Sequence, residues 1–225
     1  MSSRRDVFFN GGVFHIFNRT IEKRKLFIEP SLNERFITLF HYYRSLKAEL
    51  RYSKFVDLPV DLKKVVEERI NNPNYYKIEI LSYCLMPTHF HLLVKQKATL
   101  GVIRFLSDIV NSITRYFNIL HERQGPLFLP QFKSRRIITR EDLIHVSRYI
   151  HLNPYSATIV KTKEELVGYR WSSFSEYFRG KGALCEIAGI LDEFKGDREK
   201  YSEFVLGNRE YQKTLEAVKY SQSWL

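Results

Sequence analysis

The sequence predicts an α+β fold in which four strands form a ferredoxin-like antiparallel sheet with helices packed on it. Three observations support this prediction. Short runs rich in aromatic and β-branched residues mark four strands, and two longer stretches with apolar residues at helical spacing lie between them. Only Met86-Pro87-Thr88 separates the second strand from the third, which requires an antiparallel hairpin. The resulting order is β-α-β-β-α-β with additional helices.

Composition indicates a folded, basic chain that is attracted to polyanions, although abundant lysine is also a common device for solubility. Apolar residues make up 44% of the 225 residues and aromatic residues 15%, which supports a substantial core and argues against disorder. The net charge is +11. Residues 180–225 hold seven basic and eight acidic side chains, so the whole excess lies on residues 1–179. We therefore expect the polyanion-binding surface on residues 1–179.

The two cysteines and the absence of long apolar segments indicate a cytoplasmic location. Cys84 and Cys185 are far apart in the sequence, which supports neither a disulfide framework nor a cysteine-based zinc site. The N-terminus lacks an apolar stretch of signal-peptide length, and no segment approaches the ~20 apolar residues of a membrane span. We expect a soluble protein with no membrane partner.

The first half of the sequence is predicted to contain one strand and two helices. The strand covers residues 13–19 and is expected to be central. A helix of about five turns should begin near Ser31, which forms a capping-box signal with Glu34. Its apolar stripe consists of Phe36, Leu39, Phe40, Tyr43, Leu46 and Leu50. Residues 58–71 are expected to form a shorter helix in a helical insertion at 51–74. Its inward side chains should be Leu62, Val65, Val66 and Ile70.

The second half of the sequence is predicted to contain three strands and two helices. The predicted elements are strands at 76–85 and 89–95, a helix at 100–123, a basic strand at 132–138, and a helix from about 140 to Pro154. Gly180-Lys181-Gly182 marks a boundary. We therefore predict a main domain at 1–179 and a helical extension at 180–225.

The segment His89-Phe90-His91 is the strongest chemical signal in the sequence. Side chains alternate along a strand, so His89 and His91 lie on one face while Phe90 points into the core. Two adjacent imidazoles can bind one metal ion, although two solvent-facing histidines are the more frequent meaning of such a pattern. The apolar flanks favour a cleft here. The pair alone does not identify a reaction.

A second cluster lies on the predicted helix that ends at Pro154. Tyr149 and Asn153 are four residues apart and therefore share one helical face, with His145 one turn earlier on the same stripe. This helix can present a phenol and an amide oxygen to a facing sheet. From composition alone, a packed ring and a helix cap would be the default interpretation of the two residues.

Five motifs, in order along the chain, resemble those of the HUH single-tyrosine transposases, and among them the REP-associated tyrosine transposases. The motifs are Gly12-Val13-Phe14-His15-Ile16-Phe17-Asn18-Arg19, Tyr83-Cys84-Leu85-Met86-Pro87-Thr88-His89-Phe90-His91-Leu92-Leu93, Gly125-Pro126-Leu127-Phe128 with Phe132-Lys133, Tyr149-Ile150-His151-Leu152-Asn153-Pro154, and Tyr169-Arg170-Trp171-Ser172-Ser173-Phe174. The resemblance covers about residues 8–178. Thr88 departs from the family pattern, in which an Asn is usual.

The resemblance implies a metal-dependent DNA strand transferase and assigns its site residues. Tyr149 would be the nucleophile, and His89 and His91 would bind the metal with Asn153 in the position of the third ligand. Two imidazoles and an amide oxygen suit Mg²⁺ or Mn²⁺ better than zinc in the absence of a cysteine ligand. The expected partner is single-stranded or hairpin DNA, which Tyr149 would cleave and rejoin through a 5′-phosphotyrosine intermediate. Members of the family act as monomers or homodimers, and both states stay open.

The cationic residues near the first and fourth strands are candidates for DNA binding. They are Arg19, Lys133, Arg135 and Arg136, with Arg140 nearby. Alternation places Lys133 and Arg135 on one face of the fourth strand and Arg136 on the other, so the four cannot all follow one phosphate groove.

Several other residues carry weaker alternatives. Tyr116 is a rival nucleophile on a helix, and His15 either orients substrate or has a structural role. His121 and His145 are expected at the surface or behind the site. Two rival functions use parts of the same set of residues. A non-catalytic DNA-hairpin-binding protein needs only the basic surface, and a phosphoesterase that activates water needs only the histidines.

Overall fold

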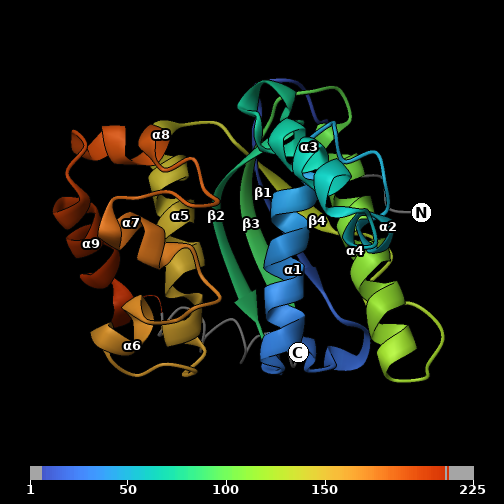
Figure 1. Cartoon of the computed structure of the whole chain (residues 1–225). Helices are drawn as coiled ribbons and strands as arrows, with labels where there is room; N and C mark the ends of the chain where they lie inside the picture. The colour runs from blue at the N-terminus through green and yellow to red at the C-terminus, as the bar shows by residue number, and fades with distance from the viewer. Residues whose placement is uncertain (1–6, 211, 213–225) are drawn as a thin grey trace. The chain divides into compact units, whose positions relative to one another are not determined.

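The computed structural model describes residues 7–210 and residue 212. Its core element is a four-stranded antiparallel sheet with the order β2-β3-β1-β4 (Figure 1). The strands are β1 (Val13–Arg19), β2 (Ile78–Met86), β3 (His89–Gln96) and β4 (Lys133–Ile137). The predicted α+β class and ferredoxin-like strand arrangement are confirmed, and β1 is central as expected.

The described residues form two compact units. The first contains residues 7–79, 87–89 and 94–136, and the second contains residues 80–86, 90–93, 137–210 and 212. The division follows β2 and β3, so each of these strands contributes to both units. The predicted boundary at 179/180 does not coincide with this division, and a functional separation at that point stays a prediction.

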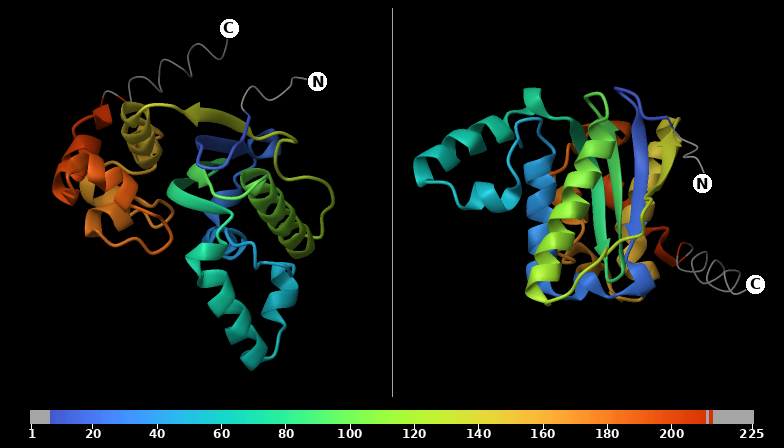
Figure 2. Two further views of the ribbon diagram at one scale, coloured as in Figure 1. Left: turned by 90° about the horizontal axis from the view of Figure 1, so that it is seen from above. Right: turned by 90° about the vertical axis from the view of Figure 1, so that its right-hand side faces the viewer.

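The first unit contains α1 (Pro30–Tyr43), α2 (Tyr52–Val56), α3 (Val60–Asn71) and α4 (Gly101–Leu120), with short 3₁₀ helices at Ile21–Lys23, Leu26–Ile28 and Pro73–Tyr75. Figure 2 shows α1 and α4 side by side. On β1, Phe14 and Ile16 are completely buried, as alternation requires of the core-facing side. The rings of Phe40 on α1 and Phe105 on α4 lie 6.0 Å apart in the same core.

Both ends of α1 differ from the prediction. The helix begins after Glu29 with Pro30 in its first turn, so the N-cap residue is Glu29, which makes no side-chain capping hydrogen bond, and not Ser31. Proline suits this position because its missing N–H would have no partner there. The helix ends at Tyr43 because the next backbone groups pair elsewhere: Arg44 O accepts from Lys77 N, and Leu46 N donates to Tyr75 O. Leu46 and Leu50 therefore lie outside the helix.

The segment 51–74, predicted as a helical insertion, contains α2 and α3, but of its predicted inward side chains only Ile70 is buried. Leu62 is 55% exposed and Val65 is 53% exposed, and only Ile70 is buried among the residues of α3. Figure 2 shows the segment projecting from the rest of the first unit. A projecting helix has few neighbours, so its apolar side chains cannot all be covered.

The second unit contains the long helix α5 (Arg140–Ser156) and several shorter helices that follow it in the chain. These are α6 (Lys163–Val167), α7 (Phe174–Arg179), α8 (Ala188–Leu191), a 3₁₀ helix at Asp192–Phe194 and α9 (Arg198–Leu206). Thr139 caps α5 by accepting a hydrogen bond from Asp142 N. The helix continues two residues past Pro154, the predicted end. Pro154 has no N–H for Ile150 O, and the Asn153 side chain donates to this carbonyl at 3.4 Å instead.

The described part of the predicted extension belongs to the second unit. The ring of Tyr201 on α9 lies 4.8 Å from that of Tyr177 on α7, and both side chains are completely buried. Its named helices are α8, the 3₁₀ helix at Asp192–Phe194 and α9, and residues 211 and 213–225 lie outside the described part. Among the described residues, no helix is both long and apolar enough to cross a membrane.

Candidate functional site

The paired histidines lie at the start of β3, directly after the hairpin turn. His91 is 5% exposed, and His89, the first residue of β3, is partly exposed. Thr88 Oγ1 and His89 Nδ1 are 3.1 Å apart. This contact engages Nδ1 and orients the ring, so Nε2 is the candidate metal-donor atom of His89. Alternation along one continuous strand puts both imidazoles on the same face, as predicted.

The predicted nucleophile lies against one of these histidines. The rings of Tyr149 and His91 meet edge to face, with centroids 5.6 Å apart and planes at 90°. Both residues belong to the second unit. The fold therefore brings together a phenol on α5 and an imidazole on β3 that are 58 positions apart in the sequence.

Asn153 is buried one turn after Tyr149 on α5. Its Nδ2 donates to Tyr149 O at 2.9 Å and to Ile150 O at 3.4 Å. The amide nitrogen is thus engaged by the helix backbone, which leaves Oδ1 as the atom able to act as a ligand. The described residues contain no group of three or more His, Cys, Asp or Glu side chains placed to bind a metal. A third protein ligand beside the two histidines would therefore have to be of another type, and the Asn153 amide oxygen is the candidate from the sequence.

A buried histidine that sequence reasoning did not select stabilises the same helix. His151 is completely buried. Its Nε2 lies 2.8 Å from Ser173 Oγ and its Nδ1 lies 2.7 Å from Tyr201 OH. Burial lowers the pKa of His151 to about 3, so the imidazole is neutral at pH 7. The residue connects α5 to the segment before α7 and to α9.

The hydrogen bonds continue beyond His151 in both directions. Tyr201 OH lies 2.6 Å from Ser147 Oγ, which lies 3.0 Å from Ser82 Oγ on β2. At the other end, Ser173 Oγ accepts from Tyr83 N at 2.9 Å. One arrangement of protons satisfies the chain: each hydroxyl donates to the next acceptor, Tyr201 donates to His151 Nδ1, and Nε2–H donates to Ser173. Such a complete network fixes α5 against β2.

One sequence signal for this network was available. Ser147 and His151 are four residues apart and share a helical stripe, which differs from the stripe that carries Tyr149 and Asn153. Two polar residues on a second stripe indicate that α5 is covered on two sides. Their partners, at positions 82, 173 and 201, could not be found from spacing.

Residues after α9 also hold the C-terminal half of α5. Gln212 Nε2 donates to Tyr149 O at 3.0 Å, and Tyr155 OH donates to Glu210. On α9, Phe204 lies 5.5 Å from the His145 ring, so this exposed histidine packs on α9. The backbone at Tyr149 is thus held by both Asn153 and Gln212.

The cationic candidates lie in the first unit. Arg19, Lys133, Arg135 and Arg136 are all exposed. Lys133 Nζ is 5.8 Å from the ring centroid of Phe17, and the Arg136 guanidinium is 4.6 Å from that of Phe9. The two cations contact different rings, in agreement with their predicted placement on opposite faces of β4.

The sequence comparison covers the elements that carry these residues. Residues 10–153, more than half of the chain, match the family described as transposase IS200-like. The chain belongs to the IS200-like transposase family. The predicted relationship to single-tyrosine transposases is confirmed, and the matched residues include the histidine pair, Tyr149 and Asn153.

A solved structure supports the fold of this IS200-like transposase. The chain is similar to "Structure of the REP associates tyrosine transposase bound to a REP hairpin", with a TM-score of 0.55 and 16% sequence identity over 84% of this chain and 93% of the other. At this identity the likeness shows the fold alone. The comparison with curated proteins gives no match.

The rival residues of the transposase have other surroundings. Tyr116 lies on α4, where the Arg35 guanidinium is 4.5 Å from its ring centroid. His121 stacks on Phe117, with ring centroids 4.0 Å apart, and its Nε2 is 3.8 Å from Glu29 Oε1. These contacts are consistent with structural or surface roles in the first unit.

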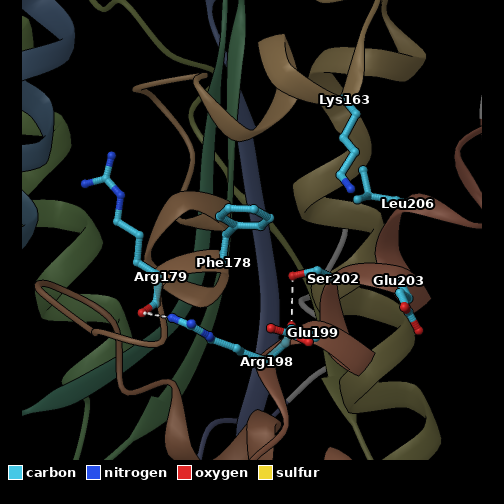
Figure 3. Close-up of a pocket in the computed structure, with 8 residues that line it drawn as sticks. All are labelled: Lys163, Phe178, Arg179, Arg198, Glu199, Ser202, Glu203 and Leu206. Carbon is cyan, nitrogen blue, oxygen red and sulfur yellow. Dashed lines mark hydrogen bonds between the residues drawn. The ribbon is translucent and has the colours of Figure 1, made fainter.

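A pocket of about 500 Å³ in the second unit contains no predicted site residue (Figure 3). It is lined by Lys163, Phe178, Arg179, Arg198, Glu199, Ser202, Glu203 and Leu206. Arg198 Nη1 donates to Arg179 O at 2.9 Å. Because Glu199 and Glu203 offset most of the positive charge, the pocket has no marked preference for a phosphate.

Proposed function

We propose that this IS200-like transposase cleaves and rejoins single-stranded or hairpin DNA through a 5′-phosphotyrosine intermediate on Tyr149. The observation that carries the proposal is the edge-to-face contact between Tyr149 and His91. It places the only tyrosine of the nucleophile motif beside the paired-histidine strand. A phosphate held at these histidines would be within reach of the phenol.

The proposed reaction conserves the energy of the phosphodiester. The Tyr149 oxygen attacks phosphorus and loses its proton to a base or water, while the bond from phosphorus to the 3′ oxygen breaks. That oxygen takes up a proton and leaves as a 3′ hydroxyl. A second 3′ hydroxyl then attacks the phosphotyrosine and regenerates the phenol. Rejoining therefore requires no nucleotide cofactor.

We propose Mg²⁺ or Mn²⁺ as the cofactor, held by His89, His91 and Asn153. The donor set fits such a cation because it combines two imidazoles with an amide oxygen and leaves positions for phosphate oxygens. When bound, the ion would neutralise the charge that develops on the phosphate. Thr88 orients His89, and the backbone of α5 orients Asn153.

The DNA partner is supported by charge and by the similar structure. The chain carries a net charge of +11, and Arg19, Lys133 and Arg135 are exposed on the strands of the first unit. The similar transposase structure is described as bound to a REP hairpin. We propose the same class of ligand, an unpaired or hairpin DNA strand, for this chain.

The test is formation of a covalent adduct. The protein is incubated with end-labelled single-stranded DNA and Mg²⁺, denatured, and separated by electrophoresis. We expect a labelled protein band that disappears in Tyr149→Phe and persists in Tyr116→Phe. If instead the DNA is cleaved with no covalent adduct, and this cleavage persists in Tyr149→Phe, the result would support a phosphoesterase that activates water. DNA binding without cleavage would support a hairpin-binding protein.

A further inference from the structure

In the first unit, an aromatic ring and several cations lie on the same face of the sheet as His89. The register follows from two backbone hydrogen bonds between β1 and β3 and their flanks. Thr20 N donates to Thr88 O at 2.8 Å, and Gln96 N donates to Gly12 O at 2.9 Å. In an antiparallel pair, a step back from Thr20 corresponds to a step forward from Thr88. Arg19 is therefore directly opposite His89, and their side chains share a face.

The same face continues along β1 with Phe17 and His15. Alternation places both with Arg19, and their rings lie 5.9 Å apart. Both side chains are partly exposed, whereas Phe14 and Ile16 on the opposite face are fully buried. Phe17 is thus an aromatic residue that the core does not fully cover.

One cation of β4 lies beside this ring, and a second follows it along the strand. Lys133 Nζ is 5.8 Å from the Phe17 ring centroid, and Arg135 lies two residues further on the same face of the strand. Arg19 lies two residues along β1 from Phe17, a separation of about 7 Å in a strand. A ring flanked by cations at this spacing matches the base and phosphates of one nucleotide.

We propose that Phe17 is a stacking site for an unpaired nucleobase, with Arg19 and Lys133 contacting the adjoining phosphates. This inference rests on the proposed function, because it assigns the occupant of the face that carries His89. Single-stranded DNA is favoured over an acidic peptide because it supplies an aromatic base for the ring as well as phosphates for the cations. The site would hold a nucleotide on the face of the first unit that carries His89.

Phe9 provides a matched control. Its ring is also paired with a β4 cation, since the Arg136 guanidinium lies 4.6 Å from its centroid, and Phe9 is 41% exposed. Arg136 is on the opposite face of β4 from Lys133. Phe9→Ala therefore removes an exposed ring with a cation partner without altering the proposed stacking site.

The test is an abasic scan of DNA binding. Affinity for a fluorescent single-stranded or hairpin oligonucleotide is measured by anisotropy, in a Tyr149→Phe background so that binding is independent of cleavage. We expect Phe17→Ala to weaken binding about tenfold, Phe17→Trp to restore it, and Phe9→Ala to leave it unchanged. Removing the base at one particular position of the oligonucleotide should lower its affinity for the parent protein. The same removal should cause no further loss of affinity for Phe17→Ala.

The outcomes separate this inference from the proposed function. Equal affinity of Phe17→Ala and Phe9→Ala, or additive effects of Phe17→Ala and every abasic position, would overturn the stacking site while leaving the transferase intact. Failure of the parent protein to bind any single-stranded or hairpin DNA would overturn both. Thermal melting of each variant is measured first, and Phe17→Trp tests the site even if Phe17→Ala is unstable.

Discussion

Replacing Tyr201 with phenylalanine should destabilise the fold by breaking the buried network at its centre. The substitution removes one hydroxyl, which lies 2.6 Å from Ser147 Oγ and 2.7 Å from His151 Nδ1. The ring contacts with Tyr177 at 4.8 Å and Phe194 at 5.3 Å are kept. The change in the free energy of unfolding therefore reports hydrogen bonding with little change in packing.

The expected loss follows from the two contacts. Each hydrogen bond contributes about 1 kcal/mol net, and a buried polar atom left without a partner costs about 1–3 kcal/mol. Ser147 keeps its contact with Ser82 at 3.0 Å, so His151 Nδ1 is the atom that loses its partner. We expect Tyr201→Phe to lower the free energy of unfolding by about 2–4 kcal/mol.

Urea unfolding followed by circular dichroism measures this loss, with Tyr76→Phe as the control. Tyr76 OH also donates a hydrogen bond, to Asn71 O at 3.2 Å, but this contact is exposed to solvent. The control should change the free energy of unfolding by less than about 0.5 kcal/mol. If Tyr201→Phe is no more destabilising than the control, the network does not hold α5 as we infer.

Three further predictions concern pH, metal and salt. Because burial lowers the pKa of His151 from 6.5 to about 3, its contribution to stability is complete above pH 6.5 and is lost as pH falls towards 3. The free energy of unfolding should therefore fall by about 3 kcal/mol between pH 7 and pH 4.5 because of this group. Urea unfolding at the two pH values measures the fall, and His151→Gln should lack this part of it. His89→Ala should abolish Mg²⁺-dependent adduct formation, whereas Asn153→Ala should be milder because water can replace an amide ligand. Retention of metal dependence in His89→Ala would contradict the assigned ligands. DNA affinity should fall steeply between 50 and 200 mM salt, as phosphate contacts release counterions, and blunt duplex should compete poorly in the same anisotropy assay. Equal competition by duplex would indicate a general basic DNA binder.

The sequence by itself determined the features that depend on local periodicity. Strand alternation assigns His89 and His91 to one face, and helical spacing assigns Tyr149 and Asn153 to one stripe. The short connection before His89 requires a hairpin, and the structure contains it. These relations need only the geometry of one element, so they can be read before the fold is known.

Only the tertiary structure decided which elements meet. The end of α1 depends on backbone pairing with Lys77, and the exposure of Leu62 depends on how far α3 projects. The contact of Tyr149 with His91 joins a helix to a strand, and the placement of Arg19 opposite His89 depends on strand register. Such contacts arise from packing and pairing between segments distant in the chain, where spacing within one segment carries no information.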